Sequence, residues 1–171
     1  MNKRYLILIF GVLIVIAVAI ILMNITYDPL DDFNGPSYIP DNYNLSRNNT
    51  TENSTFLLYK GSTRINFFLV GAIRDQNKTV INNIKSSFNN STPQNANLHI
   101  LEDKINVTGH QITVKREEIN FFGTFVSFFE TSWYCDNSKL TLVVSGVVPS
   151  TDMPQILKMI ESIKCHKTFL F

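Results

Sequence analysis

The chain has 171 residues, and its formal net charge is +1 at pH 7, with 15 Lys and Arg against 14 Asp and Glu. This length allows one domain with a core of its own and leaves room for extra segments. No block of like charges stands out and no basic stripe alternates with aromatic residues, which argues against nucleic acid as a partner.

The first element is an apolar segment at Tyr5–Met23 (YLILIFGVLIVIAVAIILM), which contains no charged residue. As a helix it spans roughly 28 Å, about the thickness of the hydrocarbon core of a bilayer. Lys3 and Arg4 precede it and aspartates follow it, so the positive-inside rule predicts a single-pass signal anchor in the cell membrane, with a cytoplasmic N-terminus and an extracytoplasmic domain. A cleaved signal peptide with its exit site at 17–19 is the alternative, but the apolar run continues beyond that site.

The anchor divides the chain into five expected parts. They are a cytoplasmic N-terminus at 1–4, the anchor at 5–23, a linker at 24–37, the extracytoplasmic domain at 38–167 and a C-terminal tail at 168–171. The linker contains two prolines, a glycine and three aspartates, with no helical or strand period. We expect it to hold the domain a short distance from the membrane.

An asparagine-rich stretch opens the domain, and we expect it to be a loop. Asn-x-Ser/Thr acceptor patterns occur here at Asn44, Asn48, Asn49 and Asn53, and elsewhere at Asn24, Asn77, Asn89, Asn90 and Asn106. Chance gives about three such patterns in a chain of this composition. The excess favours a glycosylated extracytoplasmic surface, and eight of the acceptors, all but Asn24, lie in the expected domain. The other interpretation is a compositional bias that gathers Asn, Ser and Thr in loops.

Strand and helix patterns then follow one another along the chain. We expect strands at 55–60 and 64–73, an amphipathic helix at 77–88, strands at 98–107, 110–117, 121–134 and 139–148, and a closing helix at 152–164. At 64–73 and 121–134 the residues of both parities are largely apolar, whereas a strand covered on one face alternates apolar and polar residues. The sequence therefore predicts an α+β domain: an antiparallel sheet of about six strands with helices on both faces, an α/β/α sandwich.

The two cysteines are Cys135, at the end of an expected strand, and Cys165, after the closing helix. The last strand covers roughly 30 Å and the helix returns about 20 Å, so the helix should end near the turn that follows Cys135. Disulfides persist outside the membrane. We expect a bond within the chain, with a buried free thiol or a bond between chains as the alternatives.

The sequence shows no signature of a catalytic, metal or cofactor site. The three histidines lack metal-ligand spacings such as H-x-x-x-H: His99, His110 and His166. The carboxylate pairs Glu102–Asp103 and Glu117–Glu118 are sequence neighbours, which point to opposite faces of a strand. Glu130 lies mid-strand among aromatic residues and would need a partner if it were buried. The simpler interpretation is that the strand leaves the core there.

Three stretches match the organisation of a known family. They are YIPDNYNL at 38–45, with an aromatic-x-Pro-x-x-aromatic start, LEDKINVTGHQITV at 101–114, a hairpin with an Asn/Thr-Gly turn, and KLTLVVSGVVPSTDMPQILKMIESIK at 139–164, a last strand followed by a closing helix. In these the chain resembles the PsbP-like superfamily, and more closely the PsbP-related domains that archaeal surface proteins carry behind an N-terminal anchor. The resemblance implies an α/β/α sandwich that acts without catalysis, as a binding or assembly module.

Together these features predict a non-catalytic, membrane-anchored extracytoplasmic domain that binds an unknown surface protein or an apolar ligand. The alternative is a small extracytoplasmic hydrolase-like enzyme with an unrecognised site around Glu130 or a histidine. A pocket that gathers Glu130, a histidine and a hydroxyl group would favour the enzyme. An aromatic groove without titratable groups would favour binding.

Overall fold

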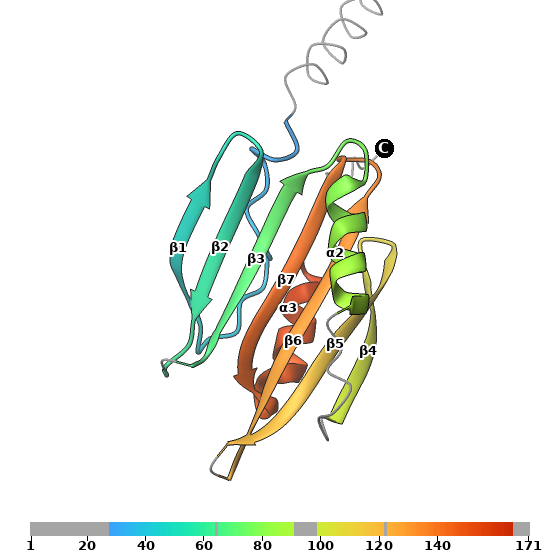
Figure 1. The fold of residues 1–171 in the computed structure, drawn as a ribbon. Helices are drawn as coiled ribbons and strands as arrows, with labels where there is room; N and C mark the ends of the chain where they lie inside the picture. The colour runs from blue at the N-terminus through green and yellow to red at the C-terminus, as the bar shows by residue number, and fades with distance from the viewer. Residues whose placement is uncertain (1–27, 64, 91–98, 122, 166–171) are drawn as a thin grey trace, which may run out of the picture.

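The described part of the chain folds as one seven-stranded antiparallel sheet with two short helices (Figure 1). This computed structural model describes residues 28–63, 65–90, 99–121 and 123–165. The strands are β1 (Asn44–Thr50), β2 (Ser54–Lys60), β3 (Phe67–Arg74), β4 (His99–Val107), β5 (His110–Phe121), β6 (Thr124–Cys135) and β7 (Leu140–Pro149). The helices are α2 (Thr79–Asn90) and α3 (Met153–Glu161), and a 3₁₀ turn at Ser150–Asp152 precedes α3.

The strands lie in the order β1-β2-β3-β7-β6-β5-β4. Strands β4 to β7 are antiparallel neighbours in sequence order, and β7 then pairs with β3. The strands before α2 (β1 to β3) and the strands after it (β4 to β7) therefore meet along the β3–β7 pair. Between β4 and β5, Thr108 and Gly109 have φ values of 48° and 87°. Positive φ at both residues is what a two-residue hairpin turn of type I′ requires.

The expected α/β/α sandwich is wrong. The sheet has seven strands instead of about six, and it makes up most of the fold. The helices have only 12 and 9 residues, so they cannot cover the faces of such a sheet as layers. The apolar residues of both parities in β3 and β6 suggested burial on both sides. Instead, one face leaves 38% of Phe67 and 44% of Phe128 exposed.

The additional strand is β1, in the segment that was expected to be a loop. All seven of its residues are exposed, and it pairs with β2 at the edge of the sheet, from Asn44 opposite Lys60 to Thr50 opposite Thr55. An edge strand that buries no side chain has no reason to alternate apolar and polar residues. The sequence NLSRNNT therefore carries no strand period.

The core lies on one face of the sheet, where α3 packs. Ile156, Met159 and Ile160 of α3 are fully buried there, together with Trp133 and Leu142 of the sheet. In Figure 1 this helix lies behind β7 and β6, whereas α2 lies in front and contacts β6. The two sheet faces therefore differ, since the core occupies one and the other is partly open.

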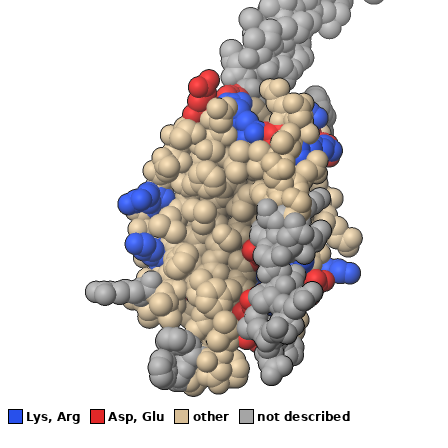
Figure 2. Space-filling view, in the orientation of Figure 1, with Lys and Arg blue, Asp and Glu red and all other residues tan. Residues whose placement is uncertain are grey.

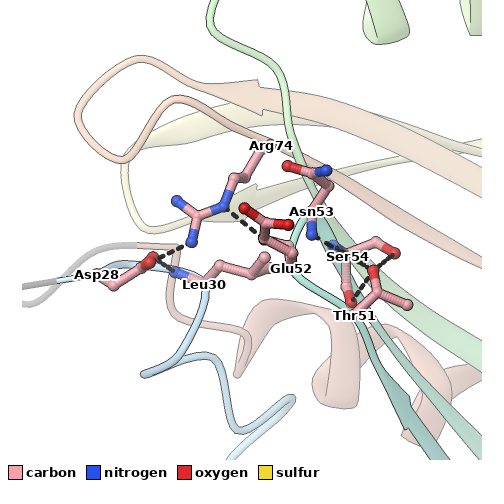
Figure 3. A network of polar contacts seen from close by, with 7 residues as sticks. All are labelled: Asp28, Leu30, Thr51, Glu52, Asn53, Ser54 and Arg74. Carbon is pink, nitrogen blue, oxygen red and sulfur yellow. Dashed lines mark hydrogen bonds and ion pairs between the residues drawn. The ribbon is translucent and has the colours of Figure 1, made fainter.

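The stretch before β1 also packs on this core, although part of it was expected to be a linker. Leu30 and Phe33 are buried, with 1% and 7% of their surfaces exposed. Asp28 accepts a hydrogen bond from the Leu30 N–H at 2.9 Å and forms an ion pair with Arg74 of β3. Arg74 Nε also donates to the Glu52 carbonyl at 2.9 Å, in the turn between β1 and β2 (Figure 3). This network fastens the first described residues to the end of the sheet.

Asp75 follows β3 directly and fixes the start of α2. Its Oδ2 accepts hydrogen bonds from the Ile81 N–H at 3.0 Å and from the Thr141 hydroxyl at 2.7 Å. Burial raises the pKa of Asp75, but these hydrogen bonds outweigh it and hold that pKa below its usual value. The carboxylate therefore links α2 to β7 as a charged group.

Within the part of the chain that the structure describes, no helix is long and apolar enough to cross a membrane. The expected anchor at 5–23 and the tail at 168–171 lie outside the described residues. Both stay predictions.

Candidate functional site

The sheet face opposite the core, which we call the open face, carries two neighbouring rows of side chains that cross five strands. The first row, which we call the apolar row after its four apolar members, runs from β3 to β4 through register partners: Phe67, Val147, Phe128, Glu117 and Ile100. The second row lies beside it, and we call it the charged row after its three charged members: Leu69, Ser145, Glu130, Lys115 and Glu102. A hollow of about 580 Å³ lies over these rows and is lined by all of these residues except Leu69.

The pleat of the strands produces this arrangement. Residues two apart on a strand point to the same face, so Phe128 and Glu130 of β6 point into the hollow. Phe129 and Trp133 have the other parity and are buried in the core. One strand thus supplies side chains to both the core and the hollow.

The large apolar residues of the apolar row are well exposed. Ile100 is 47% exposed, Phe128 44% and Phe67 38%. Figure 2 views this face and shows uncharged surface over its middle, with carboxylates to one side. Exposed apolar patches of this kind mark binding surfaces more often than isolated exposed residues do.

The charged row and Glu117 make the hollow acidic. The described residues that line it include three carboxylates, of Glu102, Glu117 and Glu130, and one ammonium group, of Lys115. Within the described residues, none of the three comes within 4 Å of Lys115 as an ion pair. Partial burial raises the pKa of Glu130, Glu117 raises it further, and Lys115 opposes the shift. The hollow therefore favours a group that brings positive charge.

Glu130 was expected to lie where its strand leaves the core, and it lies at the wall of the hollow instead. The hydroxyl-bearing residue opposite it is Ser145 of β7. No histidine is among the described residues that line the hollow. Among its described residues, the site thus combines an aromatic surface with titratable groups and does not gather Glu130 with a histidine.

The disulfide is confirmed. Cys135 at the end of β6 is bonded to Cys165 after α3, with the Cα atoms 6.1 Å apart. Both residues are buried in the core beside Trp133. The bond ties the end of the β6 strand to the end of the last helix, away from the two rows of the open face.

The histidines and the glycosylation acceptors are only partly described. His110 lies beside the disulfide, while the side chain of His99 and all of His166 lie outside the described residues. Six acceptor side chains are exposed: Asn44, Asn48, Asn49, Asn53, Asn77 and Asn106. The side chains of Asn89 and Asn90, and all of Asn24, lie outside the described residues. Exposure makes glycosylation possible at the six, and glycosylation stays a prediction.

Sequence reasoning missed the two rows as a site. The signal was present, because β3 and β6 are apolar on both parities, but it was interpreted as burial under helices. The position of His110 beside the cysteines was also missed. It is 25 residues from Cys135 and 55 from Cys165, so no compact motif contains all three.

No protein-family model and no curated protein matches this chain. The resemblance to the PsbP-like superfamily therefore stays a prediction from the three stretches that carry it.

Proposed function

We propose that the chain is a non-catalytic, membrane-anchored binding domain at the cell surface. Its open face takes up a segment of a partner protein that carries apolar side chains and at least one Lys or Arg. The observation that carries the proposal is the row of exposed Phe67, Phe128 and Ile100 beside three carboxylates.

The apolar half of the proposal rests on the free energy of burial. Covering exposed apolar surface stabilises a complex by roughly 25 cal/mol per Å². Aromatic residues that lie centrally in an interface commonly provide most of its binding energy. Phe128 is central in the apolar row, between Val147 and Glu117.

The charge of the partner segment follows from the acidic hollow. A cationic side chain next to Glu117 and Glu130 would relieve their mutual repulsion, which contributes to the raised pKa of Glu130. Such complementarity speeds association and rejects acidic partners. It also distinguishes this occupant from a purely apolar ligand.

The anchor completes the proposal. Packing of the described chain on the core begins near Asp28, a few residues after the expected span ends at Met23. The domain would then lie close to the membrane and meet partners there. Protease added to intact cells without their wall should digest the part after Asn24, and a protected domain would contradict this topology.

A peptide library tests the binding function. The full-length chain in detergent is used to select displayed peptides, with the Phe128→Ser variant used to remove non-specific binders. Selected peptides should be rich in apolar residues and in Lys or Arg. Phe128→Ser should weaken them at least about tenfold, and Glu117→Gln by about 2- to 5-fold, with less dependence on salt.

Phe125→Ser is the matched control, because Phe125 belongs to the same strand and is 56% exposed but does not line the hollow. It should bind the selected peptides like the wild type. Failure to select any peptide that distinguishes wild type from Phe128→Ser would overturn the proposal. If no peptide binds but a fluorescent fatty amine does, the result would indicate a small amphiphilic ligand instead of a protein segment.

A further inference from the structure

Three side chains from distant parts of the chain meet at the end of the sheet where β5 begins and β6 ends. A ring nitrogen of His110 and the sulfur atoms of Cys135 and Cys165 all lie within 4.8 Å of one another. They form the one group of His, Cys, Asp or Glu with metal-ligand spacing among the described residues. The Thr108 hydroxyl lies 3.3 Å from the Cys165 sulfur.

The sheet brings His110 to the cysteines through its register. Lys115 of β5 lies opposite Glu130 of β6, and continuing the same register brings position 110 opposite position 135. Cys165 arrives from the other direction, after α3. Because three separate elements supply the three side chains, the group is held by the tertiary structure and not by a flexible loop.

The donor set is one that zinc prefers. Two thiolates and one imidazole are found with an open fourth position in zinc sites, at Zn–S distances of about 2.3 Å and Zn–N distances of about 2.0–2.1 Å. Ligand atoms at those distances in a tetrahedron lie roughly 3.5–3.8 Å apart. The ligand atoms of His110, Cys135 and Cys165 lie within 4.8 Å of one another, at most about 1 Å beyond these separations, and the two sulfurs move apart once their bond is reduced.

Burial also suits zinc in this position. Cys135 is fully buried and Cys165 is 3% exposed. An isolated charge there would be strongly disfavoured. A zinc ion with two thiolates and a neutral imidazole carries no net charge, so the complex avoids that penalty.

We infer that His110, Cys135 and Cys165 bind Zn²⁺ when the Cys135–Cys165 disulfide is reduced. The disulfide sulfurs are not thiolates, so the oxidised chain does not bind the ion. With a phosphine as reductant, the S–S bond accepts two electrons, the phosphine takes an oxygen atom from water, and two thiols form. Each thiol releases its proton to solvent as its Zn–S bond forms, and water occupies the fourth position.

The two states give the same part of the fold two alternative cross-links. The disulfide holds β6 to the end of α3 in an oxidising compartment. Zinc holds the same elements together, and β5 with them, in a chain that has not yet been oxidised. Metal binding of this kind stabilises folding directly.

Cobalt provides a spectroscopic test with the full-length chain in detergent. The reduced wild type should bind one Co²⁺ with thiolate-to-cobalt absorption, and Zn²⁺ should displace it. The oxidised chain should bind none. His110→Ala should lose more than about 100-fold in affinity, since removing even an outer-shell partner of a ligand costs 10- to 100-fold. His99→Ala, at the other end of the β4–β5 hairpin, is the control and should bind like the wild type.

Thermal unfolding covers the case in which the reduced chain loses its fold. Zn²⁺ should raise the melting temperature of the reduced wild type and leave that of the oxidised chain unchanged. The inference is overturned if the reduced chain shows no thiolate–cobalt absorption, if His110→Ala binds as tightly as wild type, or if Zn²⁺ fails to stabilise the reduced chain. None of these outcomes bears on peptide binding at the open face, so the two proposals fail separately.

Discussion

Phe67 and Phe68 are neighbours in β3, yet Phe68 is completely buried whereas Phe67 is 38% exposed in the apolar row. The Phe68 ring lies 4.8 Å from that of Tyr59 and 5.1 Å from that of Tyr43, centroid to centroid. The two residues therefore separate the contribution of a side chain to stability from its contribution to binding.

Phe68→Ala should lower the free energy of unfolding by about 3–5 kcal/mol, because it leaves a cavity in the core. Phe67→Ala should lower it by less than about 1 kcal/mol, since the lost side chain is partly in water. Urea unfolding followed by the fluorescence of Trp133, the single and buried tryptophan, measures both. Equal losses in the two variants would contradict the assignment of Phe67 to an open face.

Much of the strand pattern could be predicted from the sequence. The β6–β7 hairpin, the Thr108–Gly109 turn and the joining of the cysteines all follow from local signals: apolar runs, a glycine with positive φ and the return of a helix along a strand. These signals lie within one or two neighbouring elements. The predictions of these three features agree with the structure.

The layers and the site depend on what covers each face, and the sequence does not encode that directly. A strand with an apolar residue such as Phe128 has the same sequence pattern whether a helix of its own chain or a partner protein covers that residue. The polar strand β1 is held by backbone pairing with β2, which leaves no trace in the side chains. The grouping of His110 with Cys135 depends on strand register, which becomes visible only in three dimensions.

The disulfide gives the second prediction. Cys135→Ser should lower the free energy of unfolding of the oxidised chain by about 3.5 kcal/mol, because the bond closes a loop of 30 residues in the unfolded chain. Cys135→Ser with Cys165→Ser should cost little more, since the bond is already lost in the single variant. Non-reducing peptide mapping should find the linked peptide in wild type only. A double variant much less stable than either single variant would show that the cysteines contribute separately.

The third prediction concerns glycosylation of the edge strand. Asn44, Asn48 and Asn49 are exposed on β1, and Asn53 is exposed just before β2. Mass spectrometry of the native protein should find a glycan on at least one of the four. An edge strand presents unpaired backbone groups to other chains, and a glycan would block that pairing.

Replacing the four acceptors with Gln should therefore increase self-association in light scattering, whereas Asn77→Gln, outside β1, should not. Unmodified asparagine at all four positions would favour the compositional interpretation. It would also leave β1 without this protection.

The last prediction is a pH-dependent contribution from Asp75. At neutral pH its carboxylate accepts hydrogen bonds from the Ile81 N–H and the Thr141 hydroxyl, and Asp75→Asn should lower the free energy of unfolding by about 1.5–3 kcal/mol, the range for bonds to a charged group. The pKa of Asp75 in the folded chain lies below its ordinary value of 3.8. Its stabilisation is therefore fully present above that value and is lost as the pH falls through the lower pKa of the folded state.

Urea unfolding at pH 7 and at a series of pH values below 4 should show that the difference in free energy of unfolding between wild type and Asp75→Asn shrinks only in the acid range. Asp136→Asn removes an exposed carboxylate that pairs with Lys78 and should have almost no effect at pH 7. A difference for Asp75→Asn that stays constant down to pH 2 would show that shape, and not charge, holds α2 to β7.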